Sequence, residues 1–99
     1  MGFEYKILAK FTDKEITDIY NILEHHKNFD IKYQHQNTEH FEFRNIENQG
    51  KISNLFVTFV QDGIYICQNA SSNMWTDLEE LRTYLNRENI EYEILDYAD

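Results

Sequence analysis

The sequence contains no proline, three glycines and one cysteine, and each shortage excludes a class of protein. Without proline, the chain holds no proline-rich linker. A single cysteine, Cys67, permits neither an intramolecular disulfide nor a multi-cysteine zinc site. The glycines, Gly2, Gly50 and Gly63, are too far apart to form a glycine-rich phosphate loop. The sequence therefore excludes a disulfide scaffold and a glycine-rich nucleotide site.

Long apolar runs and clusters of basic residues are also absent. No run approaches the roughly 20 residues that a membrane span requires, and residues 1–6 carry charges where a signal peptide needs an apolar segment. We therefore expect no membrane partner, no export and a cytoplasmic location. The nine basic residues are scattered and opposed by 18 acidic ones. A net charge of −9, with neutral histidines, repels phosphate, so we expect no nucleic-acid partner.

The residues that are present suit one globular domain over residues 1–99. Of these residues, 41% are hydrophobic and 15% are aromatic, which is enough for one core. The negative charge is uneven along the chain. Residues 77–99 hold eight acidic and two basic residues, a charge of −6, whereas residues 1–76 hold ten and seven, a charge of −3. Two thirds of the net charge therefore lies in the last quarter of the sequence.

Alternating apolar and polar residues predict strands with one buried face. Residues 52–60 differ, because Phe56 and Val60 are apolar on the face opposite Leu55 and Val57, and this predicts a strand in the middle of a sheet. Asp62-Gly63 after it predicts a type I′ hairpin turn, and the polar residues 34–39 predict a loop. The predicted strands are residues 3–11, 29–33, 41–44, 52–60, 64–68 and 90–95.

Two capping boxes mark the starts of two predicted helices. In the first, Thr12 and Glu15 satisfy free amide donors reciprocally, and apolar residues at helical spacing follow to about Lys27. The second, from Thr76 to Glu79, begins a helix that reaches about Glu88.

The resulting fold class is α+β with the element order β-α-β-β-β-β-α-β. Two β-α-β units with right-handed crossovers place both helices on one face of a shared mixed or antiparallel sheet. We therefore expect a ferredoxin-like variant in which the middle strands form an added meander. The apolar side chains of Phe56 and Val60 leave some apolar surface opposite the helices, which a partner subunit could cover.

No arrangement of residues in the sequence predicts catalysis. The serines lack the flanking glycines of a nucleophile elbow, and no acidic pair is placed in an apolar environment that would raise a pKa. His35, His40 and Glu39 border one loop and are candidate zinc ligands, but their spacing does not distinguish a metal site from a solvated loop. We expect no catalytic residue, no bound metal and no cofactor.

The acidic C-terminal quarter is the best candidate for a functional surface, because tyrosines lie among its carboxylates. Such a composition is typical of an interface with aromatic anchors inside a charged rim, and its charge steers a basic partner. Trp75 is either a second anchor or the lid of the core. The predicted partner-binding residues are Asp77, Glu80, Tyr84, Glu91, Tyr92, Glu93, Asp96 and Tyr97.

We therefore expect a non-enzymatic module that binds a basic protein, with the general profile of small acidic inhibitor or immunity proteins. A solvated face that only keeps the chain soluble is the simpler interpretation of the same acids. An alternative function is a homodimeric small-ligand-binding or regulatory domain that dimerises through its sheet. A decoy that mimics DNA is a weaker third. The partner and the choice between monomer and homodimer stay open at the level of sequence.

Overall fold

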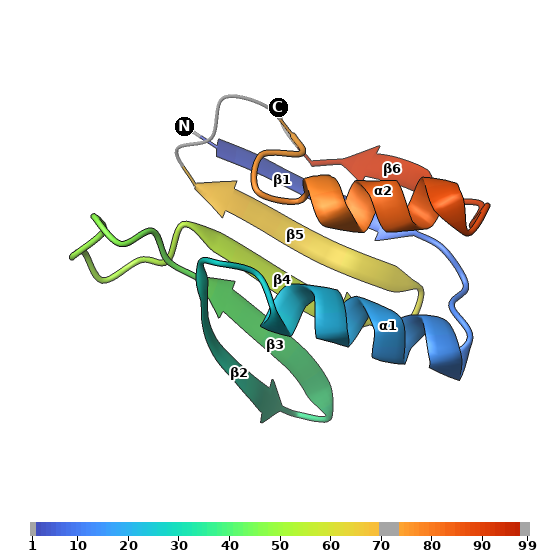
Figure 1. Cartoon of the computed structure of the whole chain (residues 1–99), viewed down its shortest axis with the longest axis horizontal. Helices are drawn as coiled ribbons and strands as arrows, with labels where there is room; N and C mark the ends of the chain where they lie inside the picture. Colours follow the sequence, from blue (N-terminus) through green and yellow to red (C-terminus); the bar gives the residue numbers. More distant parts are fainter. Residues whose placement is uncertain (1, 70–73, 98–99) are drawn as a thin grey trace.

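The computed structural model describes residues 2–69 and 74–97, and it has two helices packed against one face of a six-stranded sheet (Figure 1). The α+β class and the predicted order of elements are confirmed. Neither helix is long and apolar enough, within these residues, to cross a membrane. The elements are β1 (Gly2–Leu8), α1 (Asp13–Glu24), β2 (Phe29–His35), β3 (Thr38–Phe43), β4 (Leu55–Val60), β5 (Gly63–Asn69), α2 (Glu79–Arg87) and β6 (Glu93–Asp96).

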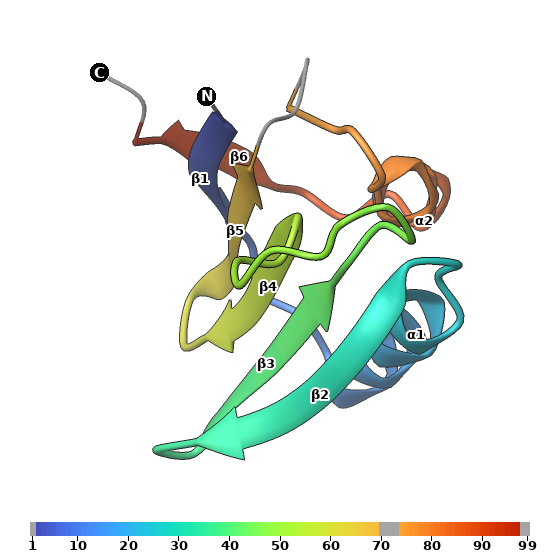
Figure 2. The same ribbon diagram turned by 90° about the vertical axis from the view of Figure 1, so that its left-hand side faces the viewer.

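The strands are ordered β2-β3-β4-β5-β1-β6, and all neighbouring strands are antiparallel. Both β5 and β6 run antiparallel to β1, which lies between them, so α2 joins two parallel strands across β1. Helix α1 leads from β1 to β2 at the opposite edge. Figure 2 shows both helices on the same side of the sheet, as the sequence predicts. We call the other side of the sheet the open face.

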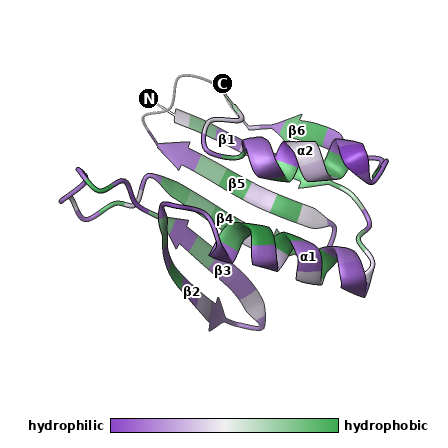
Figure 3. Ribbon diagram, viewed as in Figure 1, coloured by the Kyte–Doolittle hydropathy of each residue, from purple (hydrophilic) through white to green (hydrophobic). Residues whose placement is uncertain are grey.

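The core lies between the helices and the sheet. Central strands contribute side chains such as Ile7, Val57 and Ile66, each 0% exposed, and α1 contributes Ile19 and Leu23. Strand β4 lies third from the β2 edge and is largely hydrophobic in Figure 3. Its predicted position in the middle of the sheet is confirmed, because it pairs with β3 on one side and with β5 on the other.

The capping box of α1 is confirmed. The Thr12 hydroxyl accepts a hydrogen bond from the Glu15 amide at 3.1 Å, and the Glu15 carboxylate accepts one from the Thr12 amide at 2.9 Å. The helix ends at Glu24, with His25 as the C-cap. Since His26 turns away to bond outside the helix, the predicted end at Lys27 was too late.

The second predicted capping box is wrong. Helix α2 begins at Glu79 with Leu78 as its N-cap, and no side chain caps it. Asp77 has φ of 66°, and the Leu78 amide donates to the Trp75 carbonyl at 2.9 Å. The chain therefore makes a separate turn before the helix, which takes Thr76 out of the capping position. Glu79 and Glu80 instead provide negative charge at the positive end of the helix dipole.

The type I′ turn occurs at a different hairpin from the predicted one. Gln36 and Asn37, with φ of 52° and 65°, form a two-residue turn between β2 and β3 inside the predicted loop. This turn suits Asn, which tolerates the left-handed region. The hairpin between β4 and β5 is confirmed, but its turn residues are Gln61 and Asp62, and Gly63 is already the first residue of β5.

Candidate functional site

The eight residues predicted to bind a partner lie on separate parts of the structure. Asp77 and Glu80 lie at the start of α2, and Tyr84 lies on its buried side. The remaining residues, from Glu91 to Tyr97, lie on or beside β6, which is an edge strand. The structure therefore brings together only part of the predicted set.

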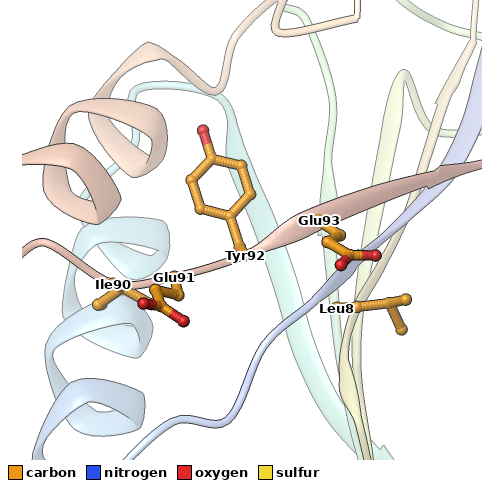
Figure 4. A pocket seen from close by; sticks show the side chains of 5 residues that line it. All are labelled: Leu8, Ile90, Glu91, Tyr92 and Glu93. Atoms are coloured by element: carbon orange, nitrogen blue, oxygen red, sulfur yellow. The ribbon is translucent and has the colours of Figure 1, made fainter.

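Three of the predicted residues come together at one hollow beside β6, which we call the edge site (Figure 4). It is lined by Leu8, Ile90, Glu91, Tyr92 and Glu93. Glu91 and Glu93 are exposed, whereas Leu8, Ile90 and Tyr92 are half-buried. Tyr92 points away from both carboxylates in Figure 4. An apolar floor beside two carboxylates suits a lysine or arginine side chain, because the aliphatic stem and the cation are both accommodated.

Tyr92 is held in place by the aromatic end of the core. Its ring lies 6.4 Å from that of Trp75, which is 6.2 Å from the ring of Tyr5. The guanidinium of Arg82 lies 5.5 Å above Trp75. Trp75 is half-buried and covers the core at this end, which matches the lid interpretation. Tyr92 therefore supports the edge site from behind.

Tyr84 is a core residue, which corrects its prediction as a surface anchor. Its side chain is 3% exposed, and its hydroxyl donates to the Asp18 carboxylate at 2.8 Å, joining α2 to α1. Burial, and then the bond to Asp18, raises the pKa of Tyr84 to about 12. The spacing of three from Leu81 places Tyr84 on the buried stripe of α2, and this spacing was the signal in the sequence.

Substituting Asp18→Asn tests this connection through its pH dependence. The hydrogen bond from Lys14 at 2.9 Å, and then the one from Tyr84, hold the pKa of Asp18 below its usual value. A lowered carboxyl pKa stabilises the fold above the unfolded pKa of about 4, and this stabilisation is lost as the pH falls through the folded pKa. We expect Asp18→Asn to lower the urea midpoint at pH 7 and to match the wild type near pH 2.

The control for that experiment is Glu47→Gln, which removes the same charge from an exposed loop. Its urea midpoint should stay close to that of the wild type at both pH values. A deficit for Asp18→Asn that is as large near pH 2 as at pH 7 would show that the ionised carboxylate is not what joins the helices.

The acidic residues at the start of α2 line a hollow together with Lys27 and two histidines at the end of α1. The hollow lies between the end of α1 and the start of α2, and the Asp77 carbonyl accepts a hydrogen bond from His26 Nε2 there at 2.8 Å. One residue of this hollow, Lys27, carries positive charge beside these acids, whereas no basic residue lines the edge site. The hollow is lined by His25, His26, Lys27, Thr76, Asp77, Glu79 and Glu80.

Asp96 and Tyr97 lie on opposite faces of the sheet. Asp96 is paired with Tyr5, whose side chain is on the helix side. The amide of Tyr97 bonds to the Glu4 carbonyl, and its ring lies 6.1 Å from that of Tyr65 on the open face. Because successive side chains of a strand alternate, these two residues cannot face one flat surface together.

The candidate zinc ligands are also separated by this alternation. Glu39 is paired with Gln34 on the helix side, whereas His40 lies on the open face, 3.1 Å from the Thr58 hydroxyl. The rings of His35 and His40 are 6.3 Å apart. Within residues 2–69 and 74–97, no three His, Cys, Asp or Glu side chains are grouped so that they could hold a metal.

Cys67 is half-buried, and burial raises the pKa of its thiol.

The exposed apolar side chains at the edges of the open face were not predicted from the sequence. Four large apolar side chains on or beside its two outer strands are exposed by 39–45%. Strand β4 gave the only signal for it, because Phe56 and Val60 are apolar opposite the core face. The exposed side chains are Ile31, Tyr33, Leu95 and Tyr97.

No protein-family model, curated protein or solved structure matches this chain.

Proposed function

We propose that this protein is a non-enzymatic binding module that engages a basic partner protein through its acidic C-terminal region. The edge site is the part of that region that carries the proposal. Its two exposed carboxylates lie beside an apolar floor on an edge strand. An inhibitor or immunity-type role is the most specific form of this function, because an acidic surface is the natural complement of a basic enzyme.

The charge distribution explains how such a partner would be recruited. Residues 77–99 carry −6 of the net −9. A field of one sign raises association rates by about 10- to 1000-fold at low ionic strength. Once the partner is in contact, a cationic side chain at the edge site replaces long-range attraction with hydrogen bonds to carboxylates, which are among the stronger interactions at an interface.

The test is the double substitution Glu91→Lys with Glu93→Lys. The wild type and the variant are immobilised side by side and exposed to the same cell extract, and proteins retained only by the wild type are purified and titrated by calorimetry. We expect a basic protein among them, with affinity for the variant at least about 100-fold weaker, since both cationic contacts become repulsive. The fold should persist, because both side chains are exposed.

The matched control reverses the same number of charges elsewhere, with Glu24→Lys and Glu47→Lys. Both residues are exposed, and the ion pair that Glu24 makes with Lys32 at 3.4 Å is at the surface. Equal losses of binding in the two variants would show that the loss is due to the net charge of the protein and not to the edge site. Unchanged binding by the Glu91 and Glu93 variant would show that the edge site is not the contact.

A homodimeric small-ligand-binding or regulatory domain is the second candidate. The position of β1 between two parallel strands joined by α2 supports a ferredoxin-like arrangement extended by the meander from β2 to β4, and the uncovered sheet supports dimerisation through it. Sedimentation equilibrium separates the candidates. A stable dimer favours this one, whereas a monomer leaves the acidic surface available to a different protein.

A further inference from the structure

The open face is organised in rows that cross the sheet. The strand register aligns Glu42, Phe56, Cys67 and Glu4 in one row, beginning with Ile31 at the β2 edge. The second row contains, in order, Tyr33, His40, Thr58, Tyr65, Lys6 and Leu95. Neighbouring strands are about 4.8 Å apart, so six strands span roughly 24 Å, which is the scale of a protein interface and not of a small ligand.

Apolar exposure is concentrated on this face. Six large apolar side chains of the described residues are exposed, and four of them lie on or beside the outer strands here. Between them lie half-buried Phe56, Val60 and Tyr65. Exposed apolar side chains at both edges of a sheet face, with half-buried apolar and aromatic residues between them, are typical of a protein interaction site.

The charge of the face defines what can cover it. Glu4, Glu42 and Glu93 lie on this face, and the guanidinium of Arg44, 3.4 Å from the Ser53 hydroxyl beside Glu42, is paired with Asp30 at 3.6 Å. The Lys6 ammonium is already paired with Asp62 at 3.1 Å. A second copy would place these carboxylates against the same carboxylates of its own face and add another −9 overall, and such like-charge contacts are costly. The face therefore fits a partner of positive charge.

Two of the carboxylates are fixed in position by hydroxyl groups. The Tyr65 hydroxyl donates to Glu4, and the Ser53 hydroxyl donates to Glu42 at 2.8 Å. Burial, followed by the bond to Glu4, raises the pKa of Tyr65. A carboxylate held beside an aromatic ring is preorganised for guanidinium, which stacks on the ring and bonds to the oxygens in its own plane.

We propose that the open face is the main docking surface for the basic partner, and that it receives an apolar segment rich in arginine. This inference rests on the proposed function and adds the surface and the side-chain chemistry. The edge site adjoins this surface, since Glu93 is paired with Leu8 in the row that also contains Gly63 and Val60. One partner can therefore contact both.

The experiment titrates isotopically labelled protein with two peptides of equal length and charge and follows the amide resonances by NMR. One peptide alternates arginine with valine, and the other alternates lysine with serine. We expect the arginine peptide to bind at least about tenfold more tightly, with the largest shifts at Tyr33, Phe56, Tyr65 and Tyr97. The pair Tyr33→Ala and Tyr97→Ala should remove this preference, whereas Glu47→Gln in the exposed loop before β4 should keep it.

Each of the other possible outcomes contradicts the open-face proposal, the proposed function or both. Shifts confined to α2 and the edge site, with equal affinities for the two peptides, would contradict the open-face surface and leave the acidic binding module standing. Failure of both peptides to bind at low salt would contradict both proposals. Concentration-dependent shifts on the open face without any peptide would identify a second copy as its occupant and overturn the inference.

Discussion

Replacing Gly63 with alanine should destabilise the protein by at least about 3 kcal/mol, measured as the free energy of unfolding in urea. Gly63 has φ of 156°, and an added Cβ would collide with the Ile7 carbonyl oxygen and lie 2.9 Å from the carbonyl carbon. That contact is backbone of the adjacent strand β1, so no side chain can rotate to relieve it. The only relief is to separate β5 from β1 in the middle of the sheet.

The control is Gly50→Ala in the loop before β4. Its added Cβ would meet only the Asn48 side-chain oxygen, at 3.3 Å, and this side chain can shift. We expect a change within about 1 kcal/mol. If Gly63→Ala unfolds at the same urea concentration as the wild type, the close packing of β1 against the start of β5 is wrong.

Replacing His26 with alanine should lower the free energy of unfolding, measured in urea, by about 2 kcal/mol. His26 Nδ1 accepts the Asn28 amide at 2.9 Å, so the ring proton is on Nε2, which donates to the Asp77 carbonyl at 2.8 Å. The ring also packs edge-on against Phe43 at 5.2 Å. One side chain thus joins the end of α1, strand β3 and the turn before α2. Two hydrogen bonds of about 1 kcal/mol each, with the aromatic contact, give the expected loss.

His25 provides the matched control, because it is the preceding residue and differs only in environment. It is exposed, and its ring Nδ1 donates to the Asn21 carbonyl of its own helix at 2.8 Å. His25→Ala should change the free energy of unfolding by no more than about 0.5 kcal/mol. Equal effects of the two substitutions would contradict the role of His26 in joining the three elements.

The sequence correctly predicted those features of the fold that depend on residues close together in the chain. The capping box of α1 works as the sequence indicates, because Thr12 and Glu15 satisfy each other's amides within one turn. The two-faced apolar pattern of β4 predicted its central position, since apolar side chains on both faces are typical of an inner strand. Both predictions need no knowledge of the remaining fold.

The failures concern properties that depend on distant residues. Thr76 and Glu79 have the spacing of a capping box, but a turn held by the Trp75 carbonyl and by His26 takes precedence. Tyr84 looks like part of an acidic surface in sequence, yet the rotation of α2 buries it against Asp18. The grouping of Glu91 with Glu93 could be predicted. The separation of Asp96 from Tyr97 needed the register with β1.

The central claim is that the acidic region recruits a basic protein, and the ionic-strength dependence of the association rate tests it most directly. The measurement uses the protein retained by the wild type and not by the Glu91→Lys, Glu93→Lys variant. We predict that its association rate falls by roughly 10-fold or more between low and physiological salt, and that the variant loses most of this dependence. A rate that does not change with salt, or that changes equally for the variant, would contradict the claim.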